Sequence, residues 1–395
     1  MELTPGLRRD PAPDLEAVGQ DEELVARIHA EIARNGPITF ARFMELALYD
    51  PAGGYYRAAA ARPGRDGDFL TAPETHPIFG AALARGLTEV WERLGRPAPF
   101  VLREYGAGTG ALILAILERL TLDRTGLELA LRYDPIEAEP RRLETIAARL
   151  AATGREDVLL EPGSRGEPVV GAVVANEVLD ALPTHRVVVR DGQLLEVLTG
   201  SSGGQFIDVE AEPTTPALAA RLSNEGIGLA EGQRGEVCLA VDGWVANAAA
   251  GLHRGLLLFI DYGYPAADLY DTTRRRDGTL RAYLRQRVHD DPYRHVGRQD
   301  LTAHVDVTAV ERAAQRAGLI RLGTTTQAEF LVGLGTQDLL QAIQADPGTT
   351  IESYLELRSA LMRLLDPIAT GRFRVMGFGR SWPDGPPLSG FAYRL

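Results

Sequence analysis

Short apolar runs alternate with amphipathic stretches through the middle of the chain, which is the pattern of strands alternating with helices. Predicted strands lie at residues 100–105, 131–137, 157–161, 171–176 and 255–261, and predicted helices at 111–120, 140–152 and 307–317. Connections of this kind place consecutive strands parallel in one sheet with helices packed against it. The pattern therefore predicts an α/β fold built on a doubly wound, Rossmann-like parallel sheet.

Helical periodicity also marks the beginning of the chain. Leu24, Ile28 and Ile32 recur at intervals of four, which predicts a helix that ends near Asn35, and Thr39 is placed to cap the next helix. Residues rich in Gly, Pro and Asp then predict a long loop before a third helix. The loop covers residues 50–75, and the third helix residues 76–94. We expect a loose tail over 1–20 and an N-terminal helical cap over 21–96.

The remaining residues, 97–395, form the predicted sheet domain, and two stretches interrupt its alternation. Residues 185–213 alternate polar and apolar positions around Asp191-Gly192, which predicts antiparallel hairpins. Residues 329–366 are helical in pattern, and 373–378 predicts a last strand. We therefore expect inserted β-hairpin and helical elements, at about 185–250 and 329–370.

A glycine-rich turn between the first predicted strand of the sheet and its helix is the strongest local signal. Gly106, Gly108 and Gly110 follow that strand, and Glu104 lies two residues before the first of them. Glycines at this position let the backbone approach a ligand where a Cβ would collide. The spacing up to Ala111 also fits a dinucleotide fingerprint. The acid before alternating glycines is typical of S-adenosylmethionine (SAM) methyltransferases, whose cofactor carries a cationic amino acid part, and we prefer SAM.

A second carboxylate is expected at the end of the next strand, where it would take the ribose hydroxyls of the cofactor. Glu137 ends the strand at 131–137 and suits that role. A solvated acid at the start of the following helix is the competing interpretation, since Glu139 is close by.

The end of the strand at 171–176 carries the candidate catalytic residues. Asn176 is placed where amino-directed methyltransferases have an Asn or Asp that accepts a hydrogen bond from the substrate nitrogen. Glu177 and Asp180 lie three residues apart and would share one face of a helical turn, so both could orient a guanidinium. Helix capping by Asn176, with acids in the first turn, is the alternative, and the two roles are compatible.

The composition of the chain excludes several classes of function. The chain has 395 residues, which suggests two domains, and 54 acidic against 42 basic residues, a net charge of −12. This acidic balance argues against nucleic-acid binding and agrees with a cationic substrate. Every basic residue is arginine, so lysine chemistry is excluded, and Cys238 is the single cysteine. No spacing of His, Asp or Glu suggests a metal site, and no apolar run approaches a membrane span, so we expect a cytoplasmic protein.

Two motifs together resemble the MidA family of SAM-dependent methyltransferases, whose mitochondrial members assist respiratory complex I assembly. These are the segments 104–110 and 176–183. Further segments resemble the family in the same order along the chain, and the resemblance covers about residues 20–380. They are 38–44, 49–56, 67–74, 77–80, 261–264, 278–283 and 300–306.

The resemblance implies a methyltransferase fold and, for mitochondrial relatives, symmetric dimethylation of a protein arginine. At matching positions it implies that Gly67 and Asp68 close over the cofactor. It also implies that the glycines of the turn line SAM, with Glu137 near its ribose. The three residues Asn176, Glu177 and Asp180 would then face the methyl acceptor.

The sequence thus predicts a SAM-dependent N-methyltransferase that acts on an arginine of a partner protein. A small-molecule methyltransferase and a non-catalytic scaffold that keeps the fold remain alternatives. A nicotinamide oxidoreductase is disfavoured by Glu104 and by the lack of an acid about 20 residues beyond the glycines. Whether the chain forms a homodimer is left open.

Overall fold

A computed structural model describes residues 18–57, 71–164 and 166–393. By its internal contacts the chain divides into two compact units. The first unit comprises Met1–Leu70, Leu179–Asp242 and Gly263–Val310, and the second comprises Thr71–Val178, Gly243–Tyr262 and Glu311–Leu395. Gly67 and Asp68 lie outside the described residues, so their expected place over the cofactor stays a prediction.

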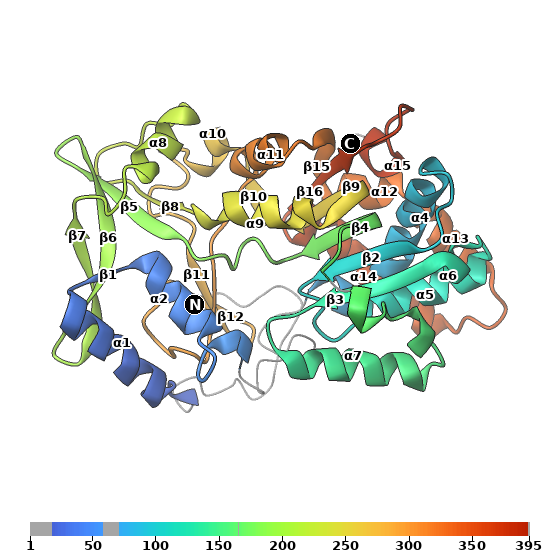
Figure 1. The fold of residues 1–395 in the computed structure, drawn as a ribbon, viewed down its shortest axis with the longest axis horizontal. Coiled ribbons are helices and arrows are strands. Elements are labelled where there is room, and N and C mark those ends of the chain that lie inside the picture. Colours follow the sequence, from blue (N-terminus) through green and yellow to red (C-terminus); the bar gives the residue numbers. More distant parts are fainter. Residues whose placement is uncertain (1–17, 58–70, 165, 394–395) are drawn as a thin grey trace. The chain divides into compact units, whose positions relative to one another are not determined.

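The second unit is built on a six-stranded sheet with the order β15-β16-β9-β4-β2-β3 (Figure 1). Its strands are β2 (Phe100–Tyr105), β3 (Leu131–Ile136), β4 (Val169–Asn176), β9 (Leu252–Asp261), β15 (Ile320–Thr326) and β16 (Arg374–Arg380). The four strands from β3 to β9 are parallel, whereas β16 runs antiparallel to β9 and β15 antiparallel to β16. The α/β architecture is confirmed, but the sheet is mixed and not parallel throughout.

Helices that belong to the second unit pack around this sheet. They are α3 (Ala72–Thr75), α4 (Ile78–Arg93), α5 (Ala111–Asp123), α6 (Leu127–Ala130), α7 (Pro140–Ala152), α12 (Gln327–Gly333), α13 (Thr336–Ala345), α14 (Ile351–Leu365) and α15 (Ser389–Ala392). Phe79 and Leu83 of α4, Ile116 of α5 and Tyr133 of β3 are buried in one apolar core. Burial of these large side chains is the main force that holds helices and sheet together.

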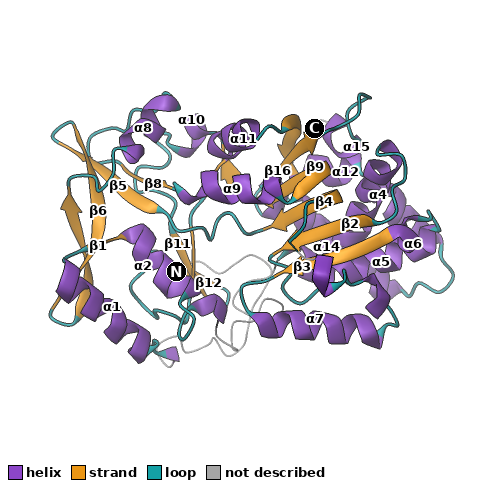
Figure 2. Cartoon of the chain, in the orientation of Figure 1, coloured by secondary structure: helices purple, strands orange, loops and turns teal. Residues whose placement is uncertain are grey.

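In the residues that the structure describes, the first unit contains three smaller sheets (Figure 2). One joins β1 (Ile38–Thr39), β5 (His185–Arg190), β6 (Gln193–Ser202), β7 (Gln205–Ala211) and β8 (Arg234–Val237). The others pair β10 (Gly263–Tyr264) with β14 (Val305–Asp306), and β11 (Arg281–Leu284) with both β12 (Arg287–His289) and β13 (Asp300–Thr302). Its helices are α1 (Glu22–Asn35), α2 (Phe40–Tyr49), α8 (Ala217–Asn224) and α10 (Ala266–Leu269). Two more, α9 (Ala240–Ala250) and α11 (Val307–Arg316), run from one unit into the other along the chain.

The N-terminal helices share one core in the first unit with residues from the later part of the chain. Leu24 of α1 and Phe43 of α2 pack in a cluster with Leu280 and Leu301, which lie far away in sequence. By contrast α4, which the sequence analysis placed with the N-terminal cap, belongs to the second unit. The units therefore do not follow contiguous stretches of sequence, because apolar faces are buried wherever a complementary surface exists.

Several local predictions can be compared directly with the structure. Thr39 does cap α2, since its side chain accepts a hydrogen bond from the Arg42 N–H, and the hairpins around Asp191-Gly192 are present. The prediction of a strand at 157–161 is wrong, because a short 3-10 helix covers Glu156–Val158 and Leu159 forms only an isolated β-bridge with Tyr133.

The strand β15 was not predicted. Most of its residues are partly exposed at the sheet edge, so it lacks the apolar run of a buried strand. None of the helices in the described ranges is both long and apolar enough to cross a membrane.

Candidate functional site

The glycine turn has a backbone that only glycine adopts readily. Gly106, Gly108 and Gly110 have φ angles of +68°, +57° and +74°, all in the left-handed region. The Gly106 N–H donates to the Ile136 carbonyl at the end of β3, at 2.9 Å, and Gly110 is the N-cap residue of α5. The turn thus lies at the carboxyl edge of the sheet, where open α/β sheets bind their ligands.

The turn touches the segment that follows β4. In the parallel pairing of β2 with β4, Tyr105 lies opposite Ala175, so Gly106 and Asn176 are the next residues on two adjacent strand ends. A Cβ built on Gly106 would lie 2.8 Å from Val178 Cγ2, which is closer than two non-bonded carbon atoms approach in proteins. The predicted cofactor turn and two predicted catalytic residues, Asn176 and Glu177, therefore occupy one edge of the same sheet.

Glu104 lies beneath the turn and is only 3% exposed. Its Oε2 accepts a hydrogen bond of 2.6 Å from the Tyr133 hydroxyl. Burial raises the pKa of Glu104 to about 8, the charge of Glu137 adds to this, and the Tyr133 hydrogen bond opposes it. A nearby cation would favour the ionised form of this carboxyl.

Glu137 binds the glycine turn directly. Its Oε1 accepts a hydrogen bond from the Gly108 N–H, and its Oε2 lies 3.6 Å from Arg142 Nη1. The side chain is only 4% exposed, and burial raises its pKa although Arg142 and the Gly108 N–H act in the opposite direction. The acid that caps the following helix is Glu139, which accepts from the Arg141 N–H. The interpretation of Glu137 as a solvated helix-start acid is therefore wrong.

The chain after β4 forms no helix, so the expected helical turn and the capping role of Asn176 are both wrong. Glu177 has a φ of +53°, an uncommon conformation for a residue with a side chain. Its N–H still pairs with the Ile260 carbonyl of β9 at 2.8 Å, and the next N–H, of Val178, donates to Asp261 Oδ2 at 3.0 Å. These sheet and side-chain contacts direct the backbone away from a helix.

Asn176 and Glu177 form a polar pair at this strand end. Asn176 is 8% exposed, and its Nδ2 donates to Glu177 Oε1 at 3.0 Å. Within the described part of the chain, the buried Oδ1 of Asn176 has no hydrogen-bond partner. Burial raises the pKa of Glu177 to about 8, with the charges of Asp261 and Glu74 adding to the shift. The pair thus offers an unused acceptor beside a carboxyl whose charge a cation would stabilise.

Two further residues of the site, Ala72 and Glu74, were not singled out by the sequence analysis. The Ala72 N–H donates to Glu177 Oε1 at 3.1 Å, and Glu74 Oε1 accepts from the Thr109 hydroxyl at 3.1 Å. Glu74 Oε2 is buried and has no hydrogen-bond partner among the described residues. The only sequence signal for these residues was the segment 67–74, in which the family resemblance drew attention to Gly67 and Asp68.

Asp180 lies in the first unit and shares no helical turn with Glu177. It is 9% exposed, and its backbone carbonyl accepts a hydrogen bond of 2.9 Å from the Ala303 N–H. Its surroundings include Glu236 and Asp306, with which it lines a small cavity of about 20 Å³. The structure therefore places Asp180 near two further acidic residues of the first unit, and its role toward a methyl acceptor stays a prediction.

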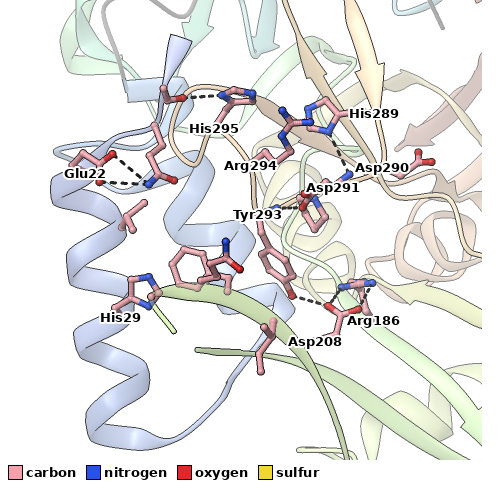
Figure 3. A pocket seen from close by; sticks show the side chains of 18 of the residues that line it. Glu22, His29, Arg186, Asp208, His289, Asp290, Asp291, Tyr293, Arg294 and His295 are labelled. Atoms are coloured by element: carbon pink, nitrogen blue, oxygen red, sulfur yellow. Dashed lines mark hydrogen bonds and ion pairs between the residues drawn. The ribbon is translucent and has the colours of Figure 1, made fainter. Parts of the chain in front are cut away.

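A larger cavity of about 1110 Å³ also lies in the first unit (Figure 3). Arg186 of β5 and Asp208 of β7, two strands that both pair with β6, form paired hydrogen bonds of 2.7 and 3.1 Å. The Tyr293 hydroxyl donates to Asp208 at 2.9 Å. None of the candidate residues that the structure describes lines this cavity.

The residues at the carboxyl edge of the second unit fit a cofactor such as SAM. The turn takes a left-handed backbone at three glycines, and the buried Asn176 Oδ1 and Glu74 Oε2 are acceptors without a partner in the described ranges. The carboxyls of Glu104 and Glu137 lie beside the turn, and a bound cation would favour their ionised forms. The described residues contain no group of three or more His, Cys, Asp or Glu side chains that could hold a metal ion.

Comparisons with known proteins agree with this cofactor. A family model described as "Putative S-adenosyl-L-methionine-dependent methyltransferase" matches residues 82–325. A crystal structure from Burkholderia thailandensis with S-adenosyl-homocysteine bound is similar to this chain with a TM-score of 0.85 and 35% identity, and the match covers 97% of each chain.

Curated relatives carry a more specific name. The Drosophila melanogaster "Protein arginine methyltransferase NDUFAF7 homolog, mitochondrial" is 28% identical over 98% of this chain and 92% of its own length. The Homo sapiens "Protein arginine methyltransferase NDUFAF7, mitochondrial" is 27% identical over 79% of this chain and 73% of its own length.

Proposed function

Because the chain belongs to this family of SAM-dependent methyltransferases, the MidA-like family that its motifs resemble, we propose that it methylates a nitrogen of an arginine side chain in a partner protein. The unpaired, buried Oδ1 of Asn176 beside the glycine turn is the observation that carries this proposal. The names of the relatives support arginine as the acceptor.

When bound, SAM supplies a methyl group on a positively charged sulfur. In the transfer the carbon–sulfur bond breaks, a carbon–nitrogen bond forms, and the acceptor nitrogen then loses a proton to solvent. The protein's contribution to such a displacement is to align the acceptor and to exclude water.

Asn176 is suited to align the acceptor. Its Oδ1 can accept an N–H from the incoming nitrogen, while its Nδ2 stays bound to Glu177 Oε1. The amide is thereby held in one orientation, and a fixed acceptor selects one nitrogen of a guanidinium. Filling this acceptor also removes the cost of leaving a buried oxygen unpaired.

Glu177 is suited to hold the acceptor's positive charge. Its carboxyl is already positioned by the Ala72 N–H and by Asn176. Entry of a guanidinium favours the ionised form of a carboxyl whose pKa is otherwise about 8, so the carboxyl releases its proton and forms a charge-assisted contact.

The test measures transfer of labelled methyl groups from SAM to proteins of a lysate, followed by acid hydrolysis and separation of methylated amino acids. We expect label in methylarginine. Asn176→Leu should reduce transfer about 10- to 100-fold, because it removes a hydrogen bond to a charged group. Asn176→Asp keeps the acceptor oxygen and should keep part of the activity.

Calorimetric titration with S-adenosyl-homocysteine is the control, because both variants should bind it like the unmodified protein. Label confined to small molecules would replace the proposal with a small-molecule methyltransferase. Cofactor binding without label in any fraction would favour the scaffold.

A further inference from the structure

Glu74 connects the glycine turn to the short segment before α4. Its Oε1 accepts the Thr109 hydroxyl from the turn, and two residues earlier the Ala72 N–H donates to Glu177. The segment thus bonds to both halves of the site, the cofactor turn and the end of β4. Its second carboxyl oxygen, Oε2, is buried without a hydrogen-bond partner within the described part of the chain.

The charge around Glu74 is unbalanced. Four carboxyls surround the turn, and they belong to Glu74, Glu104, Glu137 and Glu177. The guanidiniums that act on Glu74 are those of Arg142 and Arg149 on α7. Arg142 also lies beside Glu137, and Arg149 Nη1 donates to the Thr109 carbonyl.

Desolvation of the Glu74 carboxyl raises its pKa, and the charge of Glu74 in turn adds to the raised pKa of Glu177. A cation that enters this region therefore favours the ionised forms of these carboxyls and is attracted by them, and a neutral ligand is not.

SAM and its product differ in their charge, and the carboxyl of Glu74 distinguishes ligands by charge. S-adenosyl-homocysteine lacks the transferred methyl group and has one positive charge fewer, while the rest of the two molecules is the same. We propose that Glu74 is a specificity-determining residue that makes the site prefer the positively charged SAM to the uncharged sulfur of its product. The preference assists exchange of product for fresh SAM after each transfer.

This inference rests on the SAM-dependent activity of the proposed function and not on the identity of the acceptor. It concerns the dissociation constants of two small ligands, which are measured without any methyl acceptor. A failure to find methylarginine would overturn the proposed acceptor and leave this inference standing, and the reverse also holds.

The experiment is calorimetric titration of the full chain with SAM and with S-adenosyl-homocysteine. Glu74→Gln keeps the size of the side chain and an oxygen for the Thr109 hydroxyl but removes the charge. We expect its affinity for SAM to fall roughly tenfold, and its affinity for the product to stay within about twofold. A lowered ratio of the two affinities is a readout that a merely structural role would not move.

Two matched variants separate charge from support. Thr109→Val removes the hydroxyl that Glu74 accepts, which favours the ionised carboxyl, so this variant is titrated at a pH above the pKa of Glu74. There the charge is kept, and the ratio of affinities should match that of the unmodified protein. Glu74→Asp also keeps the charge and should keep the preference for SAM, which tests the idea even if the Gln variant does not fold. An equal loss of both affinities in Glu74→Gln, an unchanged ratio, or a lost preference in Glu74→Asp would overturn the proposal.

Discussion

Replacing Gly106 with alanine tests whether the turn requires glycine for two separate reasons. The φ of +68° costs a residue with a Cβ about 1–2 kcal/mol. The added Cβ would also lie 2.8 Å from Val178 Cγ2, and overpacking of this kind costs about 1–3 kcal/mol. We therefore expect Gly106→Ala to lower the free energy of unfolding by about 2–5 kcal/mol.

Gly154 offers a control with the same backbone angle. Its φ is also +68°, but a Cβ there would meet no heavy atom within 4 Å. Gly154→Ala should therefore show the cost of the angle alone, about 1–2 kcal/mol. The double variant Gly106→Ala/Val178→Ala removes the methyl group that collides and should recover the additional loss.

Thermal unfolding of these variants, together with titration by S-adenosyl-homocysteine, measures both consequences. In Gly106→Ala the turn must shift to avoid Val178. We therefore expect its affinity for S-adenosyl-homocysteine to fall more than tenfold, since about 1.4 kcal/mol corresponds to a factor of ten. The reasoning is refuted if Gly106→Ala is no less stable than Gly154→Ala, or if the double variant recovers neither stability nor affinity.

Two further predictions concern buried charges of the second unit. The pKa of Glu104 is raised to about 8, so the folded protein retains a proton that the unfolded chain releases above about pH 4.5. Stability should therefore fall as the pH rises from 5 to 8. Glu104→Gln should flatten this pH dependence of the melting temperature, and an unchanged slope would contradict the assignment. Arg103 Nε donates to Asp134 Oδ2 at 2.7 Å, and both side chains are buried. Arg103→Met leaves Asp134 unpaired and should lower the free energy of unfolding by about 3–5 kcal/mol in chemical denaturation, and Arg103→Met/Asp134→Leu should recover most of this loss. Equal stability of the two variants would show that the lost charge pairing is not the cause.

The sequence alone determined the parts of this protein that depend on short-range pattern. A continuous apolar run identified β4, because strands buried on both faces carry few polar residues, and the apolar residues that begin β2 identified that strand. The glycine turn and Glu104 were also visible, since a turn at the end of a strand is a local property. These features were sufficient to predict SAM, which the comparisons support.

Local pattern failed where distant residues decide the backbone. The spacing of Glu177 and Asp180 fits a helical turn, but the Ile260 carbonyl and the Asp261 carboxylate bind the backbone after β4 and prevent it. The strand β15 was missed for a related reason, because an edge strand is defined by its pairing with β16 and lacks a buried apolar run.

The tertiary structure alone decided which polar groups share the site and which remain unpaired. Glu74 is bound to the turn through Thr109, 35 residues away, and Ala72 is bound to Glu177 across 105 residues. No periodicity encodes such contacts, because they arise only when separate elements pack together. Burial then acts on the assembled carboxyls, and it raises their pKa values because water is excluded from a space that no single segment encloses.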